Sequence, residues 1–154
     1  MKLVTVLLLC VLASCGQNRN VQSTYEITGT QAERVFEVSR LISKFTSLPT
    51  SLLDANFVEE KTGDGRLGPS DFKAFYALKI APADLAAWRS AMPAIEAQNT
   101  PAAFSTPRAL RPWWLTQSEF RGLTFYSAAA LTGRINGWVG VAPDGRIFVY
   151  TVTM

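Results

Sequence analysis

Two segments of the chain carry apolar residues at the spacing of an amphipathic helix. The first begins after Thr30, which forms a capping box with Glu33 three residues later. Its apolar face comprises Val35, Val38, Ile42 and Phe45. The second covers residues 82–92, because Pro82 suits a first helical turn and Leu85, Trp88 and Met92 fall on one face. We therefore predict two helices, each of which buries one face against a core.

Alternating apolar and polar residues predict strands elsewhere in the chain. The predicted strands cover residues 53–58, 71–80, 119–127, 134–142 and 146–153. Glycine and proline within residues 62–70 indicate the loop of a hairpin, and Pro143-Asp144-Gly145 indicates a tight turn between the last two strands. The pattern predicts an α+β fold, in which two helices cover one face of a mainly antiparallel sheet of about five strands. The predicted domain has two layers and the chain order α-β-β-α-β-β-β.

The tight turn also predicts the register of the last two strands. Trp138 then faces Tyr150, and Val139 faces Val149. Phe148 shares the side of Trp138 and Tyr150, because side chains alternate along a strand. One side of this hairpin is therefore aromatic, and the other is aliphatic and suits packing under the helices.

The aromatic side of the hairpin is a candidate binding surface. With neighbouring tryptophans and arginines it would comprise Trp138, Tyr150, Phe148, Trp113, Trp114, Arg111, Arg134 and Arg146. Trp, Tyr and Arg are the residues that concentrate binding energy at interfaces. In the alternative arrangement, the proline-rich residues 93–118 cross over this side, and the tryptophans complete a second small core.

The N-terminus carries an apolar run from Leu3 to Leu12 after Lys2, which is the layout of a secretory signal peptide. The run is too short to span a bilayer, since a transmembrane helix needs roughly 20 apolar residues. It closes with Leu12-Ala13-Ser14-Cys15, which resembles the lipobox of bacterial lipoproteins. The alternative is an ordinary signal peptide in which Cys15 merely follows small residues.

The resemblance implies that the chain is cut before Cys15 and that the thiol carries lipid. Residues 1–14 would then be the signal peptide, the polar residues 15–24 a flexible tether, and residues 25–154 a single α+β domain. Acyl chains would hold the protein at the membrane, since each buried CH₂ contributes about 0.8 kcal/mol. By the same resemblance, Gly16 implies an outer-membrane location facing the periplasm if the envelope is Gram-negative.

The composition limits the chemistry that the domain can perform. The chain contains no histidine, and Cys10 would leave with the signal peptide. This excludes Ser-His-Asp and Cys-His nucleophile arrangements and the usual zinc sites. We therefore expect no metal site, no cofactor and no catalytic residues. A hydrolase that uses carboxylates alone remains the enzymatic alternative.

The charges of the C-terminal third are unevenly balanced. Its arginines are Arg108, Arg111, Arg121, Arg134 and Arg146, whereas its acids are Glu119 and Asp144. This excess favours anionic lipid or an acidic envelope protein as a partner, and an exported chain does not meet nucleic acid. Alternatively, the arginines are dispersed solubilising charges.

These observations together predict a lipid-anchored binding or inhibitory module of the cell envelope, with an unknown ligand. The alternative is a structural or assembly accessory that joins an envelope complex through an aliphatic groove or an edge strand.

Replacing Cys15 tests the anchor. In native cells that are fed labelled palmitate, a Cys15→Ser chain is expected to incorporate no label, because it lacks the thiol that would be acylated. The matched control is Cys10→Ser, which lies inside the predicted signal peptide and should leave labelling intact. Labelling that survives in Cys15→Ser would contradict lipidation at this residue.

Overall fold

The computed structural model describes residues 22–63, 68–93 and 104–153. Outside these ranges lie the predicted signal peptide, Cys15, most of the predicted tether, residues 64–67 of the hairpin loop and residues 94–103 of the predicted crossing. The elements are β1 (Gln22–Ile27), α1 (Gln31–Ile42), β2 (Asp54–Thr62), β3 (Asp71–Lys79), the 3₁₀ turn η1 (Pro82–Asp84), α2 (Leu85–Ala91), α3 (Gln117–Phe120), β4 (Thr124–Ser127), α4 (Ala129–Thr132), β5 (Gly137–Val141) and β6 (Arg146–Thr153). None of the helices in these three ranges is long and apolar enough to cross a membrane.

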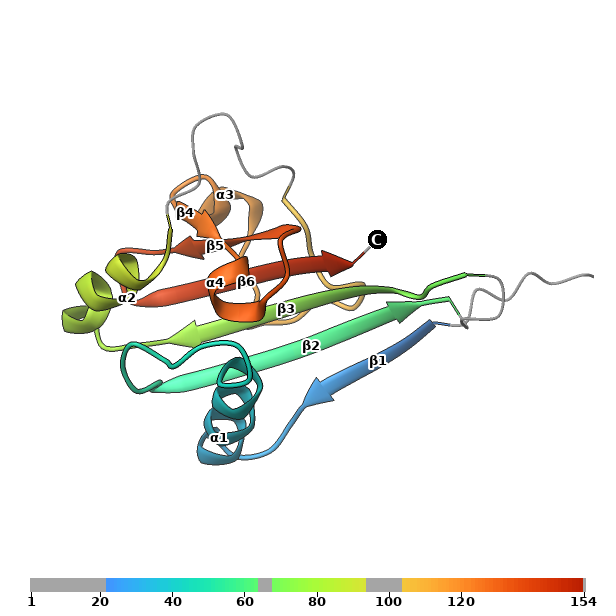
Figure 1. Ribbon diagram of the computed structural model, residues 1–154, viewed down its shortest axis with the longest axis horizontal. Coiled ribbons are helices and arrows are strands. Elements are labelled where there is room, and N and C mark those ends of the chain that lie inside the picture. Colours follow the sequence, from blue (N-terminus) through green and yellow to red (C-terminus); the bar gives the residue numbers. More distant parts are fainter. Residues whose placement is uncertain (1–21, 64–67, 94–103, 154) are drawn as a thin grey trace, which may run out of the picture.

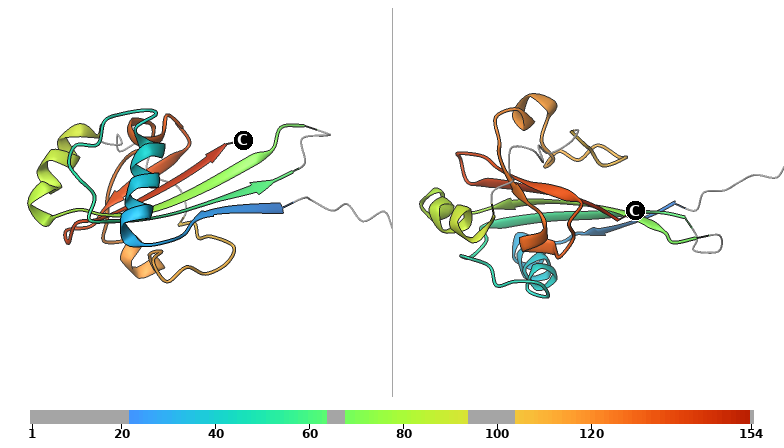
Figure 2. Two further views of the ribbon diagram at one scale, coloured as in Figure 1. Left: turned by 90° about the horizontal axis from the view of Figure 1, so that it is seen from below. Right: turned by 45° about the horizontal axis from the view of Figure 1, so that its top comes forward.

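The strands form one antiparallel sheet with the order β1-β2-β3-β6-β5-β4 (Figure 1). Helix α1 lies against one face, and the segment that carries α3 crosses the opposite face (Figure 2). This confirms the predicted α+β fold, although the sheet has six strands where about five were predicted.

The sixth strand is β1, which the sequence pattern did not reveal. It begins at Gln22, so the last residues assigned to the tether belong to the sheet. Only Ile27 of this strand is buried, because β1 is an edge strand with polar residues on both sides. An edge strand of this kind lacks the apolar alternation on which strand prediction depends.

The predicted strand 119–127 was too long. Residues Gln117–Phe120 instead form α3, and β4 covers only Thr124–Ser127. Thr116 and Glu119 make a capping box at the start of α3, as Thr30 and Glu33 do at the start of α1. Because the capping box satisfies backbone N–H groups locally, it favours a helical turn over an extended strand.

The first face of the sheet holds the aliphatic core. The predicted capping box of α1 is present, and Val38 and Ile42 point into this core. Trp88 of α2 joins the same cluster. The predicted aliphatic side of the last hairpin contributes Val139, Val141, Ile147 and Val149. Both predicted helices therefore contribute to this core, α1 by lying against the face and α2 through Trp88. Each fully buried aliphatic side chain contributes about 1.5 to 3 kcal/mol.

The predicted register of the last hairpin is also confirmed. Trp138 pairs with Tyr150, and Val139 pairs with Val149. Gly137 begins β5 with φ of 146°, and a Cβ atom added there would lie 2.0 Å from the carbonyl oxygen of Tyr150. Only glycine permits this close approach of β5 and β6.

The second face of the sheet holds an aromatic core. Its buried members are Val58, Phe75, Ala77, Trp114, Leu115, Trp138 and Phe148. Residues 104–123, here called the crossing segment, pack over them through side chains that include Phe104 and Phe120. The crossing segment thus covers the aromatic side of the hairpin, as in the second arrangement considered for residues 93–118.

Trp138 tests the aromatic core, because its side chain is only 2% exposed and packs against rings of Phe120 and Phe125. Trp138→Ala is expected to lower the free energy of unfolding by about 3 to 5 kcal/mol, since it leaves a large cavity. Denaturant unfolding followed by circular dichroism measures this loss.

Two further variants calibrate that measurement. Trp138→Phe should cost less, because it keeps a ring and removes a buried indole N–H that has no hydrogen-bond partner among the described residues. Ile135→Ala, at a side chain that is 81% exposed, should change stability by less than about 0.5 kcal/mol. Equal losses for Trp138→Ala and Ile135→Ala would contradict the burial of Trp138.

Candidate functional site

Four of the five arginines of the C-terminal third hold acidic side chains of the same chain. The ion pairs join Arg108 to Glu60, Arg111 to Glu26, Arg134 to Glu59, and Arg146 to both Glu119 and Asp144. Three of these acids come from β1 and β2, at the other end of the sequence. The excess of arginine is therefore balanced by acids that the fold brings to it, which reduces the charge available to an anionic partner.

Two of these arginines attach the crossing segment to the sheet. The Arg111 guanidinium lies 2.8 Å from a carboxylate oxygen of Glu26 on β1. The backbone N–H of Arg108 donates to Glu60 at 2.6 Å, and its guanidinium donates to the hydroxyl of Thr62. Glu60 is only 4% exposed, so its contacts with Arg108 offset the free-energy cost of removing this carboxylate from water. The crossing segment is thereby fixed over β1 and β2.

Most of the predicted aromatic surface is inside the molecule. Trp138, Phe148 and Trp114 are buried, whereas Trp113 and Tyr150 are half-buried. The Trp114 ring packs edge-on against Phe148 at 5.6 Å between centroids, and its indole N–H donates to the backbone of the crossing segment. Of the five predicted aromatic residues, Trp113 and Tyr150 are therefore the most accessible.

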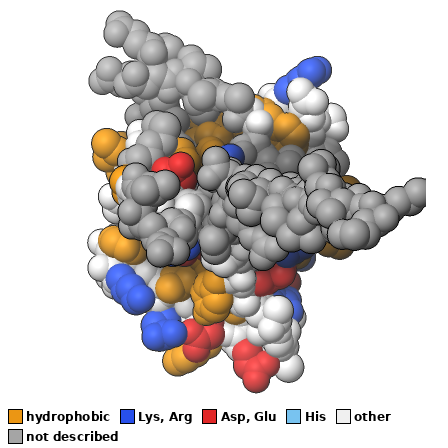
Figure 3. All heavy atoms as spheres, turned by 90° about the vertical axis from the view of Figure 1, so that its right-hand side faces the viewer, with side chains coloured by type: hydrophobic (Ala, Val, Ile, Leu, Met, Phe, Trp, Pro, Cys, Tyr) orange, Lys and Arg blue, Asp and Glu red, His pale blue; other side chains and the backbone are white. Residues whose placement is uncertain are grey.

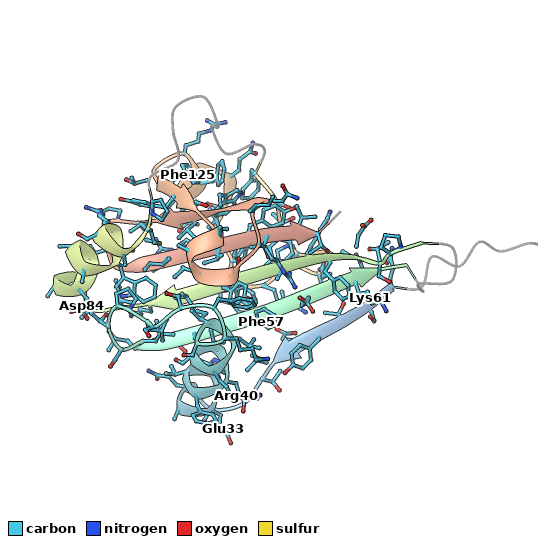
Figure 4. All side chains as sticks on the ribbon, in the orientation of Figure 1. Glu33, Arg40, Phe57, Lys61, Asp84 and Phe125 are labelled. Atoms are coloured by element: carbon cyan, nitrogen blue, oxygen red, sulfur yellow. The ribbon has the colours of Figure 1, made fainter. Side chains whose placement is uncertain are left out.

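One groove of about 350 Å³ stays open at the end of the sheet where β2 begins and β3 ends. Figure 4 marks this end by Asp84 and the opposite end by Lys61. The groove, here called the end groove, is lined by Asp54, Asn56, Ala77, Leu78, Lys79, Pro112, Trp113, Trp114, Thr116, Glu119, Arg146 and Phe148. Strand ends thus form one side, and the crossing segment forms the other.

The charged residues of the end groove follow from the strand register. Asp54 pairs with Lys79, and Lys79 pairs with Arg146. Directly opposed residues of antiparallel strands project from the same face, so these three side chains form a row across β2, β3 and β6. Asn56 and Phe148 lie two residues further along their strands, on the same face.

Glu119 is fixed at the edge of the end groove. One carboxylate oxygen accepts hydrogen bonds from the backbone N–H of Thr116 at 2.7 Å and from its hydroxyl at 2.9 Å, and the other accepts from Arg146 at 2.8 Å. The Thr116 backbone N–H, followed by Arg146, lowers the pKa of Glu119 from 4.5 to about 2. In turn, Glu119 and Asp144 raise the pKa of Arg146. Asp54 is similarly held, because its carboxylate lies 2.7 Å from the guanidinium of Arg34.

This arrangement suits binding better than catalysis. A general acid or base works best with a pKa near the working pH, and Glu119 is shifted away from neutrality. Among the residues that the structure describes, no group of three or more Cys, Asp and Glu side chains is placed to hold a metal ion. The end groove instead offers fixed charges, an amide and an aromatic wall.

A second cavity, of about 510 Å³, lies within the crossing segment. Its lining is mostly apolar and consists of Phe104, Thr106, Pro107, Leu110, Arg111, Pro112, Trp114, Leu115, Thr116 and Gln117. Leu110 on its rim is 88% exposed. Phe104, which lines this cavity, follows the undescribed residues 94–103 directly in the chain, whereas all the lining residues named for the end groove are described ones.

Comparison with known proteins adds no guide to the site, because no protein family, characterised protein or solved structure matches the chain.

The sequence prediction found part of the end groove and missed the rest. Trp113, Trp114, Phe148 and Arg146 were predicted and do line it. Arg111 and Arg134 are instead ion-paired away from the end groove. Asp54, Asn56, Lys79 and Glu119 were missed. The capping box at Thr116 could have identified Glu119, and the register of the first predicted hairpin could have placed Asp54 opposite Lys79.

Glu119 predicts a specific pH dependence of stability. Its folded-state pKa of about 2 lies below the ordinary 4.5, so ionised Glu119 stabilises the fold above about pH 4.5, and this contribution is lost as the pH falls toward 2. A Glu119→Gln variant should therefore be less stable at neutral pH, by no more than about 1 kcal/mol because solvent screens the pair. The difference between variant and wild type should shrink between pH 4.5 and 2 in denaturant titrations. Parallel stability curves would contradict this role.

Proposed function

We propose that this protein is a lipid-anchored binding module of the cell envelope, which presents the end groove to a ligand. The observation that carries the proposal is the position of two features at the ends of the sheet, namely the point where the chain enters it and the end groove. The chain enters the sheet at Gln22, which pairs with Thr62 beside the β2–β3 loop, whereas the end groove lies at Asp54 and Lys79. The proposed anchor and the proposed binding site are therefore at opposite ends.

Distances along the chain support this orientation. Only residues 16–21 separate Cys15 from β1, so that a lipid on Cys15 would keep Gln22 within about 25 Å of the bilayer surface. Strand β2 has nine residues and separates the two ends of the sheet by about 26 Å. Such an anchor permits an orientation in which the end groove faces away from the membrane, toward soluble or polymeric envelope components.

The surface near the entry point of the chain supports anchoring by lipid rather than by charge. Figure 3 views the molecule from this side, and its visible surface mixes Lys and Arg side chains with Asp and Glu side chains and hydrophobic ones. Stable electrostatic attachment to an anionic membrane requires a cluster of basic residues. The described residues visible on this side thus offer only weak attraction to an anionic membrane, which is consistent with attachment through acyl chains.

A second candidate function, an assembly accessory, is favoured by the open edge of β1. Strand β1 is the terminal strand of the sheet, and its residues from Gln22 to Tyr25 are exposed. Tyr25 is 56% exposed and Phe36 on neighbouring α1 is 66% exposed. An unpaired edge with adjacent exposed aromatic residues can accept a strand from another protein.

Site-specific photocrosslinking in native cells distinguishes the two functions. A photoreactive amino acid at Asn56 samples the end groove, one at Thr24 samples the β1 edge, and one at exposed Lys44 serves as the matched control. We expect an adduct from Asn56 and none from Thr24 or Lys44, because the ligand occupies the end groove. Adducts from Thr24 alone would instead establish the assembly function, and equal adducts from all three positions would contradict both.

A further inference from the structure

The end groove carries no net charge. Its acids are Asp54 and Glu119, and its bases are Lys79 and Arg146. Asp54 is already neutralised by Arg34, and Glu119 by Arg146. Lys79 makes no ion pair with any residue in the described ranges, but Arg146 holds the additional carboxylate of Asp144. A strongly anionic or cationic ligand therefore gains little Coulomb energy here, whereas a neutral polar ligand loses none.

The ordered side chains of the end groove leave donors and acceptors open. Asp54 uses one carboxylate oxygen to accept from Arg34 and from the backbone N–H of Ala55, and its second oxygen has no partner among the described residues. Arg146 uses Nε and one terminal nitrogen, and the other terminal nitrogen makes no hydrogen bond within the residues that the structure describes. The Asn56 amide makes no hydrogen bond within the described part of the chain and can both donate and accept. Because Asp54 and Arg146 are held by partners, little entropy is lost when a ligand binds them.

The opposite wall of the end groove is apolar. Half-buried Trp113 stands at 88° to Trp114, with 6.1 Å between ring centroids, and Pro112 lies beside it. Phe148 also lines the groove. A bound molecule thus meets hydrogen-bonding groups along the strand ends and an aromatic surface along the crossing segment.

We infer that the end groove binds a saccharide unit of a neutral glycan. A pyranose ring has hydroxyl groups that both donate and accept hydrogen bonds, and it has an apolar face of C–H groups that packs on an aromatic ring. The volume of about 350 Å³ lies in the range of small-ligand pockets, roughly 300 to 1,000 Å³. This inference rests on the proposed function and names the class of its ligand.

A peptide fits the end groove less well. The row formed by Asp54, Lys79 and Arg146 runs across the strands, so an extended peptide lying along it cannot add to the sheet by main-chain pairing. Its charged termini would also compete with the existing ion pairs of Asp54 and Arg146. Binding of a peptide is therefore an outcome that would overturn the inference.

Titration of the purified full chain tests the inference with three probes. These are a β-1,4-linked N-acetylglucosamine tetramer, an α-1,4-linked glucose tetramer and a tetra-alanine peptide, each followed by calorimetry and tryptophan fluorescence. We expect one saccharide to bind and to change the tryptophan emission, because Trp113 contacts it. Binding of the amino-sugar tetramer would identify a wall-type glycan strand as the source, and binding of the glucose tetramer would identify a neutral hexose polymer.

Variants locate the binding site. Trp113→Ala should weaken saccharide binding at least tenfold, and Asn56→Ala should weaken it severalfold without removing the aromatic wall. Phe36→Ala, an exposed aromatic residue on α1 outside the end groove, should bind as the wild type does. Because Trp113 is half-buried, the Asn56→Ala result decides the question if Trp113→Ala fails to fold.

The inference is overturned if neither saccharide binds, if only the peptide binds, or if folded Trp113→Ala and Asn56→Ala keep wild-type affinity. Photocrosslinking at Asn56 distinguishes failure of the glycan inference from failure of the proposed function. A protein adduct at Asn56 would keep the binding module and reject the glycan. The absence of any Asn56-specific adduct would reject the binding module itself.

Discussion

The attachment of the crossing segment to β1 and β2 is the interaction on which the second half of the structure depends. Arg111 reaches Glu26, and Arg108 satisfies Glu60 through both its backbone and its side chain. Glu60 is buried, so that loss of its partner would leave an uncompensated charge, at a cost of about 3 to 5 kcal/mol. These contacts keep residues 104–123 over the aromatic face, which would otherwise expose Phe75 and Trp138 to water.

The same attachment builds the end groove. Trp113 follows Arg111 by two residues, and its position is therefore set by the ion pair with Glu26. The chain then enters the capping box of Thr116, which aims Glu119 at Arg146 on β6. One wall of the groove is thus held at both ends by charge-assisted hydrogen bonds, which are stronger than neutral ones. A neutral ligand makes few strong contacts, so the free energy of its binding cannot also offset the ordering of mobile side chains. Donors and acceptors that are already fixed avoid that cost.

The sequence predicted those features that depend on neighbouring residues. The capping box at Thr30, the last hairpin and the division of that hairpin into aliphatic and aromatic sides all follow from local spacing. Strand β1 was missed because its exposed polar residues lack a periodic pattern. The pairing of Arg111 with Glu26 spans 85 positions in the chain, and no local signal announces a contact at that separation. The arginines therefore resembled a surface for a partner, whereas the fold uses most of them internally.

The pKa and the ion pairs of the acids in the end groove bear on whether it suits ligand binding or catalysis. A hydrolase built from carboxylates alone needs one acid with a raised pKa to donate a proton and a second that stays ionised. In the end groove, Glu119 has its pKa lowered to about 2, and Asp54 is paired with Arg34. Glu119 is therefore a fixed hydrogen-bond acceptor at neutral pH, and Asp54 accepts hydrogen bonds from Arg34 and from the backbone N–H of Ala55. If the end groove binds a saccharide as proposed, these fixed acceptors would orient its hydroxyl groups without first having to be ordered by the ligand.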